Sequence, residues 1–277
     1  MVTPVEHDAR GIVAPARGLT KFRLDRHPPS PAVGRFVDRY WIVTWDLRGD
    51  EPFTQQVLAH PVVNVVFGYD LNVTVHGVTT RITSRTLTDT GRVLGVMFRP
   101  AGFRPFFGRP LSTITDHALA AREVFGPSVD ELAAAVEAAA TQHEMVSLVD
   151  DYLRARVPET VQPSEETTAI AERVAADPTI ARVDALAAAV GLSVRQLERR
   201  FADHVGASPK SVIRRYRLYE AAERARSGTP PDWAELARVL GYSDQAHLSR
   251  EFAAAFGISP QRYARHCMGD AVPGLAG

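Results

Sequence analysis

Residues 186–209, LAAAVGLSVRQLERRFADHVGASP, recur in altered form as residues 236–260, LARVLGYSDQAHLSREFAAAFGISP. Both copies begin with Leu-Ala, pass through Gly-x-Ser, Leu-x-Arg-x-Phe and Gly, and end with Ser-Pro. The spacing is the same in both, except for one extra residue between the serine and the next matched leucine in the second copy. Matches at so many positions in one register indicate a duplicated structural unit.

Each copy predicts a short helix, a glycine turn and a second helix. Gly191 and Gly241 stand where a helix ends and the chain needs a left-handed residue. Ser193 is expected to cap the second helix of the first copy, with Gln196 completing a capping box. Ser243 is expected to cap the corresponding helix of the second copy. Two helices joined by a short glycine turn form a helix-turn-helix unit.

The second helix of each copy has an apolar face and a polar face. At 100° per residue, Leu197 and Phe201 point to the core, whereas Arg195 and Arg199 point away from it. Arg250 has the same position in the second copy. Arginine can bind both acceptors of guanine, so these helices suit the major groove of DNA. Solvated charges on an ordinary helix are the alternative, and the duplication favours DNA binding.

Charge is balanced over the whole chain, with 32 basic and 32 acidic residues, but not locally. Between Arg195 and Arg226 nine basic residues stand against four acidic ones. Such a patch gives salt-dependent affinity for phosphates, and Lys210 and Arg214 are expected to supply part of it. Pairs such as Glu220 with Arg224 would offset some of this charge. The helix predicted over residues 209–226 would span about 27 Å, comparable with the ~34 Å between successive major-groove faces.

These features together resemble the AraC/XylS family of bacterial transcription regulators over about residues 165–266. The resemblance includes both copies, the long helix with Arg217 and the closing Tyr263-Ala264-Arg265. The chain departs from the family at two positions. Ala246 stands where some relatives have a polar side chain, and Ala264 stands after the closing tyrosine, where relatives often have an arginine. By position, the resemblance implies phosphate contacts from Ser193, Ser243 and Ser249. It implies base contacts from Arg195, Glu198, Arg199, Gln245, His247 and Arg250.

Upstream, residues 35–98 show the pattern of strands. Runs of β-branched and aromatic residues, such as 40–43 and 62–67, are separated by Gly, Asp and Pro. This predicts an antiparallel barrel or sandwich. The segment resembles, more weakly, the β-rich domains that precede this DNA-binding module in many members of the family. Those domains commonly bind a small effector, dimerise, or do both.

The predicted fold class is therefore α+β, with a β-rich domain followed by an all-α domain that holds two helix-turn-helix units. The expected division is a β-rich sensor or dimerisation domain over 1–117, a helical connector over 118–156, a linker over 157–168, the DNA-binding domain over 169–267 and a disordered tail over 268–277.

Other chemistry is weakly represented. Trp41, His60, His76 and Arg99 are the candidates for an effector site. The two histidines also allow an alternative, a metal-dependent cupin-like enzyme with an accessory helical domain. No third ligand stands at a telling offset and Cys267 is the only cysteine, so no metal, cofactor or catalytic residue is expected.

The expected partners are double-stranded DNA, a small effector, RNA polymerase and a second copy of the chain. No membrane partner is expected, because the apolar runs are far shorter than the ~18 residues of a membrane span. No signal peptide is visible in the first thirty residues. The expected location is the cytoplasm.

Overall fold

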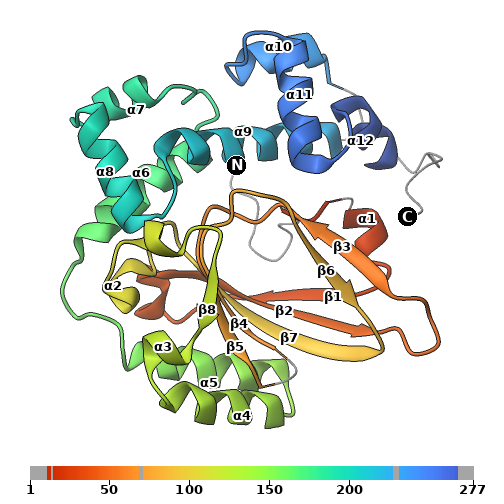
Figure 1. Cartoon of the computed structure of the whole chain (residues 1–277), viewed down its shortest axis with the longest axis vertical. Helices are drawn as coiled ribbons and strands as arrows, with labels where there is room; N and C mark the ends of the chain where they lie inside the picture. Colours follow the sequence, from red (N-terminus) through yellow and green to blue (C-terminus); the bar gives the residue numbers. More distant parts are fainter. Residues whose placement is uncertain (1–10, 14, 69–70, 227–230, 268–277) are drawn as a thin grey trace.

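A computed structural model describes residues 11–13, 15–68, 71–226 and 231–267. The chain forms a sheet domain followed by a helical domain (Figure 1). The strands are β1 (Arg23–His27), β2 (Val37–Asp46), β3 (Phe53–Val57), β4 (Asn64–Phe67), β5 (Val73–His76), β6 (Thr83–Leu87), β7 (Thr90–Phe98) and β8 (Ala118–Ala120). The helices of the sheet domain are α1 (Pro15–Gly18), η2 (Val33–Arg35), α2 (Arg104–Phe107), η3 (Leu111–Ile114), α3 (Arg122–Phe125), α4 (Ser128–Ala138) and α5 (Gln142–Arg154). The helices of the helical domain are α6 (Pro163–Ala176), α7 (Val183–Ala189), α8 (Val194–His204), α9 (Pro209–Arg226), α10 (Trp233–Val239), α11 (Gln245–Phe256) and α12 (Pro260–Cys267).

The main sheet is antiparallel and open, with the strand order β1-β2-β7-β4-β5-β8, and β3 pairs separately with β6. Among the described strands the sheet therefore does not close into the barrel that was one of the two expected forms. Alternate residues of β4 and β5 are buried, as a half-buried strand requires. Tyr40 is fully buried on the inner face, where its hydroxyl donates to the carboxylate of Asp150 on α5 at 2.9 Å.

Residues 118–156, which were expected to form a helical connector, belong to the sheet domain instead. β8 lies inside this range and pairs with β5, and α3, α4 and α5 cover the inner face of the sheet (Figure 1). Their buried residues, including Leu132, Val149 and Leu153, share one apolar core with the sheet. The segment therefore completes the sheet domain. The linker is shorter than the expected range 157–168, because α6 already begins at Pro163. The tail over 268–277 lies outside the described residues.

Trp41 and Trp45 lie on the face of the sheet opposite to Tyr40, because residues four apart in a strand share a face. The Trp41 ring covers Gly95 so closely that a Cβ on this glycine would lie 2.0 Å from the ring. Trp45 covers Gly91 in the same way. The two glycines therefore provide the space in which these rings lie flat against the sheet.

The helical domain contains two separate apolar cores. The first contains Leu197 and Phe201 and the beginning of α9, and the second contains Leu248 and Phe252 and the rest of α9. Tyr216, near the middle of α9, packs against both cores. Helices α7 and α8 lie at one end of α9 and α10 and α11 at the other (Figure 1). α9 therefore joins two units that are each built around their own core.

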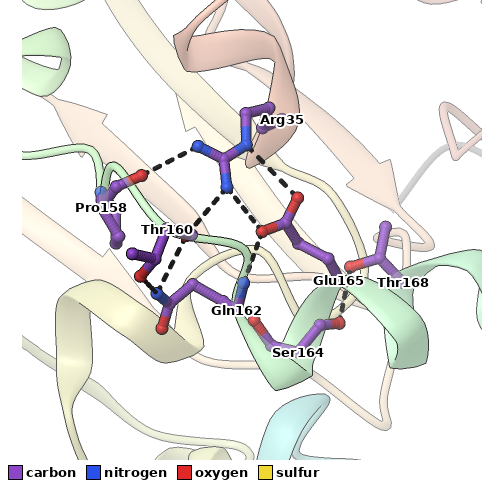
Figure 2. A network of polar contacts seen from close by, with 7 residues as sticks. All are labelled: Arg35, Pro158, Thr160, Gln162, Ser164, Glu165 and Thr168. Carbon is purple, nitrogen blue, oxygen red and sulfur yellow. Dashed lines mark hydrogen bonds and ion pairs between the residues drawn. The ribbon is translucent and has the colours of Figure 1, made fainter.

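The sheet domain is attached to the beginning of the helical domain through Arg35. Figure 2 shows its guanidinium donating to the backbone oxygens of Pro158 and Thr160 at 2.8 and 3.0 Å, and pairing with Glu165 at 2.7 Å. The same carboxylate accepts the backbone N–H of Gln162 at the start of α6. The hydrogen bond from Arg35 lowers the pKa of Glu165 below its usual value. Arg35 thus fixes both the linker and the first turn of α6.

Further contacts join the two domains along α6, α8 and α9. Arg104 pairs with Asp203 on α8 at 2.8 Å, and Arg99 pairs with Glu172 on α6. On α9, Tyr219 donates from its hydroxyl to the backbone oxygen of Leu58 at 2.7 Å. The sheet domain therefore contacts the helix that joins the two units of the helical domain.

Candidate nucleic-acid interface

The turns of both helix-turn-helix units have the conformation that the glycines predict. Gly191 and Gly241 have φ angles of 69° and 68°. In the first unit Ser193 caps α8, and the side chain of Gln196 accepts the Ser193 N–H at 2.8 Å, which completes the predicted capping box. The first turn of α8 is thus stabilised as its sequence requires.

The prediction that Ser243 caps the second unit is wrong. The N-cap of α11 is Asp244, whose carboxylate accepts the His247 N–H at 2.6 Å. The reason is the extra residue in the second copy. In both units the cap stands four positions before the buried leucine, Leu197 or Leu248, so the insertion moves the cap by one position.

The second helices of the two units present the polar faces that their sequences predict. Leu197, Phe201, Leu248 and Phe252 are fully buried. The opposite faces carry most of the residues expected to contact bases. Of the six expected residues, His247 is half-buried, whereas Arg195, Glu198, Arg199, Gln245 and Arg250 are exposed.

The three arginines of this set have no ion pair among the described residues and can bind an external partner. Within the described parts of the chain, Arg195, Arg199 and Arg250 have no carboxylate within ion-pair distance. Their neighbours differ, because Arg200 pairs with Glu166 at 2.9 Å and Arg214 pairs with Glu251 at 2.9 Å. Unpaired guanidiniums on an exposed helix face keep their donors available for bases or phosphates.

The residues expected to bind phosphate have different surroundings. Lys210 is exposed at the start of α9, as are Ser193 and Ser243 at the two turns, whereas Ser249 is half-buried. Arg214 is half-exposed, and its ion pair with Glu251 holds α9 against α11. A phosphate at Arg214 would therefore compete with this carboxylate. The phosphate contacts stay predictions.

Three residues of the second unit were not identified from the sequence. Tyr242 is buried, and its ring meets the His247 ring edge to face at a centroid distance of 5.2 Å. Glu251 lies 3.5 Å from Nε2 of His247. Asp244, the cap of α11, is the third. The sequence Gly-Tyr-Ser-Asp at 241–244 indicates the turn, but it does not predict which of these side chains contact His247.

A histidine at the end of α8 has a lowered pKa. Burial lowers the pKa of His204 below its usual value of 6.5, outweighing the opposing charge of Asp203. The imidazole lies 2.8 Å from the hydroxyl of Thr167 on α6, and Asp203, Arg104, Arg200 and Glu166 surround it electrostatically. A lowered histidine pKa contributes stability that is present above pH 6.5 and is lost as the pH falls below it.

We therefore expect the unfolding temperature of the wild type to fall more steeply between pH 7.5 and 5.5 than that of His204→Gln. Glutamine keeps a hydrogen-bonding side chain without the titration. The pKa of His76 is also lowered by burial, but His76 is present in both proteins, so the difference isolates His204. Differential scanning calorimetry over this range measures the effect. An equal fall of the unfolding temperature with pH in both proteins would show that His204 does not cause the pH dependence.

The four effector candidates do not form one site. Trp41 and His76 lie on the same face of the sheet, with Asn64 between them: the Trp41 indole donates to Asn64 at 3.2 Å, and Asn64 is the cross-strand partner of His76. His60 instead packs against Tyr219 of α9, and Arg99 pairs with Glu172 of α6. Two candidates therefore lie on the sheet face and two at the domain interface.

A cavity of about 10 Å³ lies between the sheet and α3 to α5, lined by apolar residues such as Phe67, Val96 and Leu132. This volume is close to that of a single water. Among the described residues, no three His, Cys, Asp or Glu side chains gather as they would around a metal. No described helix has the length and the apolar character needed to cross a membrane.

Two family models match the chain. A helix-turn-helix domain family matches residues 186–266, and a domain family of unknown function matches residues 25–120. The first match covers both units described above. The second covers most of the main sheet.

Relatives of the helical domain are transcription regulators. The HTH-type transcriptional regulator MtrA of Neisseria gonorrhoeae is 32% identical over 81 residues, 29% of this chain and 27% of that protein. An AraC-like transcription regulator of Streptomyces antibioticus is 34% identical over 83 residues, 30% and 27% of the two chains. The HTH-type transcriptional activator RhaS of Pectobacterium atrosepticum is 33% identical over 76 residues, 27% of each chain. The chain thus spans about a quarter of the length of these relatives.

Solved structures of ToxT from Vibrio cholerae have a distant likeness in fold. One has a TM-score of 0.40 at 11% identity, covering 89% of this chain and 98% of that chain. Another, with an unsaturated fatty acid bound, has a TM-score of 0.39 at 11% identity, covering 91% and 94%.

Proposed function

We propose that the helical domain of this chain is a DNA-binding domain of the AraC/XylS family, and that the protein is a sequence-specific transcription regulator. In this proposal α8 and α11 enter adjacent segments of the major groove. Arg195, Arg199 and Arg250 read bases there, and Lys210 binds phosphate. The protein acts in the cytoplasm, where its target DNA would lie.

The observation that carries the proposal is the matched pair of free arginines. Arg199 and Arg250 hold the same position two residues before a buried phenylalanine, each on an exposed helix face and each without an ion pair among the described residues. An arginine that is only exposed to solvent need not be repeated at the same position of two units. Bidentate binding to guanine gives such a reason.

We expect Arg199→Ala to weaken binding to the preferred DNA sequence by about 1–3 kcal/mol and to relax the preference at one base pair. DNA fragments selected from a random pool by wild type and variant, followed by binding measurements on the selected sequence, test this. Lys210→Ala is the contrasting control, because loss of a phosphate contact weakens all sequences alike and reduces the salt dependence. Identical preferences for wild type and Arg199→Ala would contradict the assignment.

We further propose that a small effector binds the sheet face that carries Trp41 and His76, and that the domain interface transmits its presence to α9. The half-buried aromatic and imidazole side chains beside Asn64 support this place. Calorimetric titration of small molecules related to the regulated genes, with wild type and Trp41→Ala, tests it.

A second copy of the chain and RNA polymerase are further proposed partners. Light scattering with and without residues 1–160 tests the former.

A further inference from the structure

The relative orientation of the two helix-turn-helix units is not set by a common core. Phe201 and Phe252 belong to different apolar cores, and each core packs on its own part of α9, with the partly buried Tyr216 of α9 against both. Apolar packing fixes each unit on the helix, but an operator requires the angle between the units to be fixed as well. Contacts made directly between the units are therefore the candidates for this role.

Such a contact exists where the segment before α7 meets the turn before α11. Gly241 approaches Ala181 so closely that a Cβ on the glycine would lie 2.4 Å from the Ala181 Cβ. The same Cβ would lie 3.4 Å from Nη2 of Arg217. The first unit, the second unit and α9 thus meet at one point.

Arg217 of α9 contacts both units at this point. Its Nη1 donates to the backbone oxygen of Ala181 at 3.5 Å, and its guanidinium lies 4.3 Å from the centroid of the Tyr242 ring. A guanidinium at this distance from an aromatic ring makes a cation–π contact. Nε of Arg217 is buried and has no hydrogen-bond partner in the described residues. The side chain is therefore held by these two contacts, one to each unit.

The contact continues to the predicted DNA-binding face. The Tyr242 ring contacts His247 as well as Arg217, and the centroids of the Tyr242 and His247 rings lie 5.2 Å apart. His247 is one of the residues expected to read bases. A movement of Tyr242 relative to Arg217 would thus change the position of α11 relative to the first unit.

Taking DNA binding as proposed above, we propose that Arg217 is a positioning residue that fixes the angle between the two units and so sets the number of base pairs between the two half-sites. It touches no DNA itself. One base pair of B-DNA moves a half-site by about 3.4 Å and rotates it by about 34°. A protein whose units are held rigidly must reject such a change, and a protein whose units can pivot on α9 can tolerate it.

The test uses the full chain and the DNA sequence that wild type selects from a random pool. Operators with one base pair inserted or removed between the half-sites are compared with the selected operator by fluorescence anisotropy. For wild type we expect the altered spacings to bind at least about tenfold more weakly, the loss typical of one wrong base pair. For Arg217→Met, which keeps the apolar stem, we expect a difference below about threefold, with unchanged affinity for a single half-site.

Variants of the ring provide matched controls. Tyr242→Phe should keep the spacing preference, because the ring that contacts Arg217 and His247 remains. Tyr242→Leu should lose the preference as Arg217→Met does. Arg217→Lys, which keeps the charge, should restore part of it.

The outcomes are distinguishable. A spacing preference that survives Arg217→Met overturns the proposal, as does an equal loss of affinity at every spacing, which would indicate a purely structural role. A wild-type protein that selects no pair of half-sites overturns the proposed function, and the role of Arg217 with it.

Discussion

Phe201→Ala is expected to lower the free energy of unfolding of the first helix-turn-helix unit by about 3–5 kcal/mol and to leave the second unit folded. Phe201 is fully buried and belongs to a core that the second unit does not share. Phe252→Ala should have the reverse effect, because Phe252 is equally buried in the other core. The cavity left by a phenylalanine is too large for the surrounding side chains to fill completely.

Hydrogen exchange followed by mass spectrometry measures this effect for each unit separately. In Phe201→Ala we expect faster exchange over residues 183–213 with unchanged exchange over 233–264, and the opposite in Phe252→Ala. Ala202→Ser, an exposed change beside Phe201, should leave the exchange within experimental scatter. Loss of protection in both units together, in either variant, would show that the two cores unfold as one.

Arg215→Met is expected to weaken the attachment of the sheet domain to α9. Arg215 is 8% exposed, and its guanidinium donates to the backbone oxygens of Ala59 and Thr79. Its removal leaves both oxygens without this donor, at about 1–3 kcal/mol for each one that water cannot reach. Tyr219→Phe should have a smaller effect of about 1 kcal/mol, because one hydrogen bond to Leu58 is lost while the ring stays.

Small-angle scattering and limited proteolysis of residues 155–162 report this attachment. We expect a larger radius of gyration and faster cleavage in Arg215→Met than in wild type. Arg214→Met is the matched control on the same helix, since the ion pair of Arg214 with Glu251 lies within the helical domain. The expectation is wrong if Arg215→Met stays as compact as wild type, or if Arg214→Met opens equally.

The duplicated sequence predicted the helical domain well, because its signals are local. Glycine at a left-handed turn, a capping box and an apolar stripe each depend on residues a few positions apart. Gly191, Ser193 and the α9 helix over Pro209–Arg226 are as expected. The cap was wrongly predicted at Ser243 because Ser243 matches Ser193 of the first copy. One inserted residue moved the cap to Asp244.

Features that depend on distant partners were not predicted. The Ala- and Leu-rich pattern of residues 128–154 correctly indicated helices, but periodicity does not say what an apolar face packs against. These helices cover the sheet instead of connecting the domains. His60 and Arg99 likewise gave no sign that their partners are Tyr219 and Glu172, more than 70 residues away. Exposure of the arginines expected to contact DNA followed from helix periodicity, whereas the partner of Arg214 did not.

The domain interface has a consequence for how such a protein can evolve. Arg215, Tyr219 and Thr168 of the helical domain donate to backbone oxygens of the sheet domain, at Ala59, Leu58 and Pro100 among others. A backbone oxygen persists whatever side chain its residue carries. The side chains on the surface of the sheet domain can therefore change while these acceptors are retained, so that one helical domain can be combined with sheet domains of different surface.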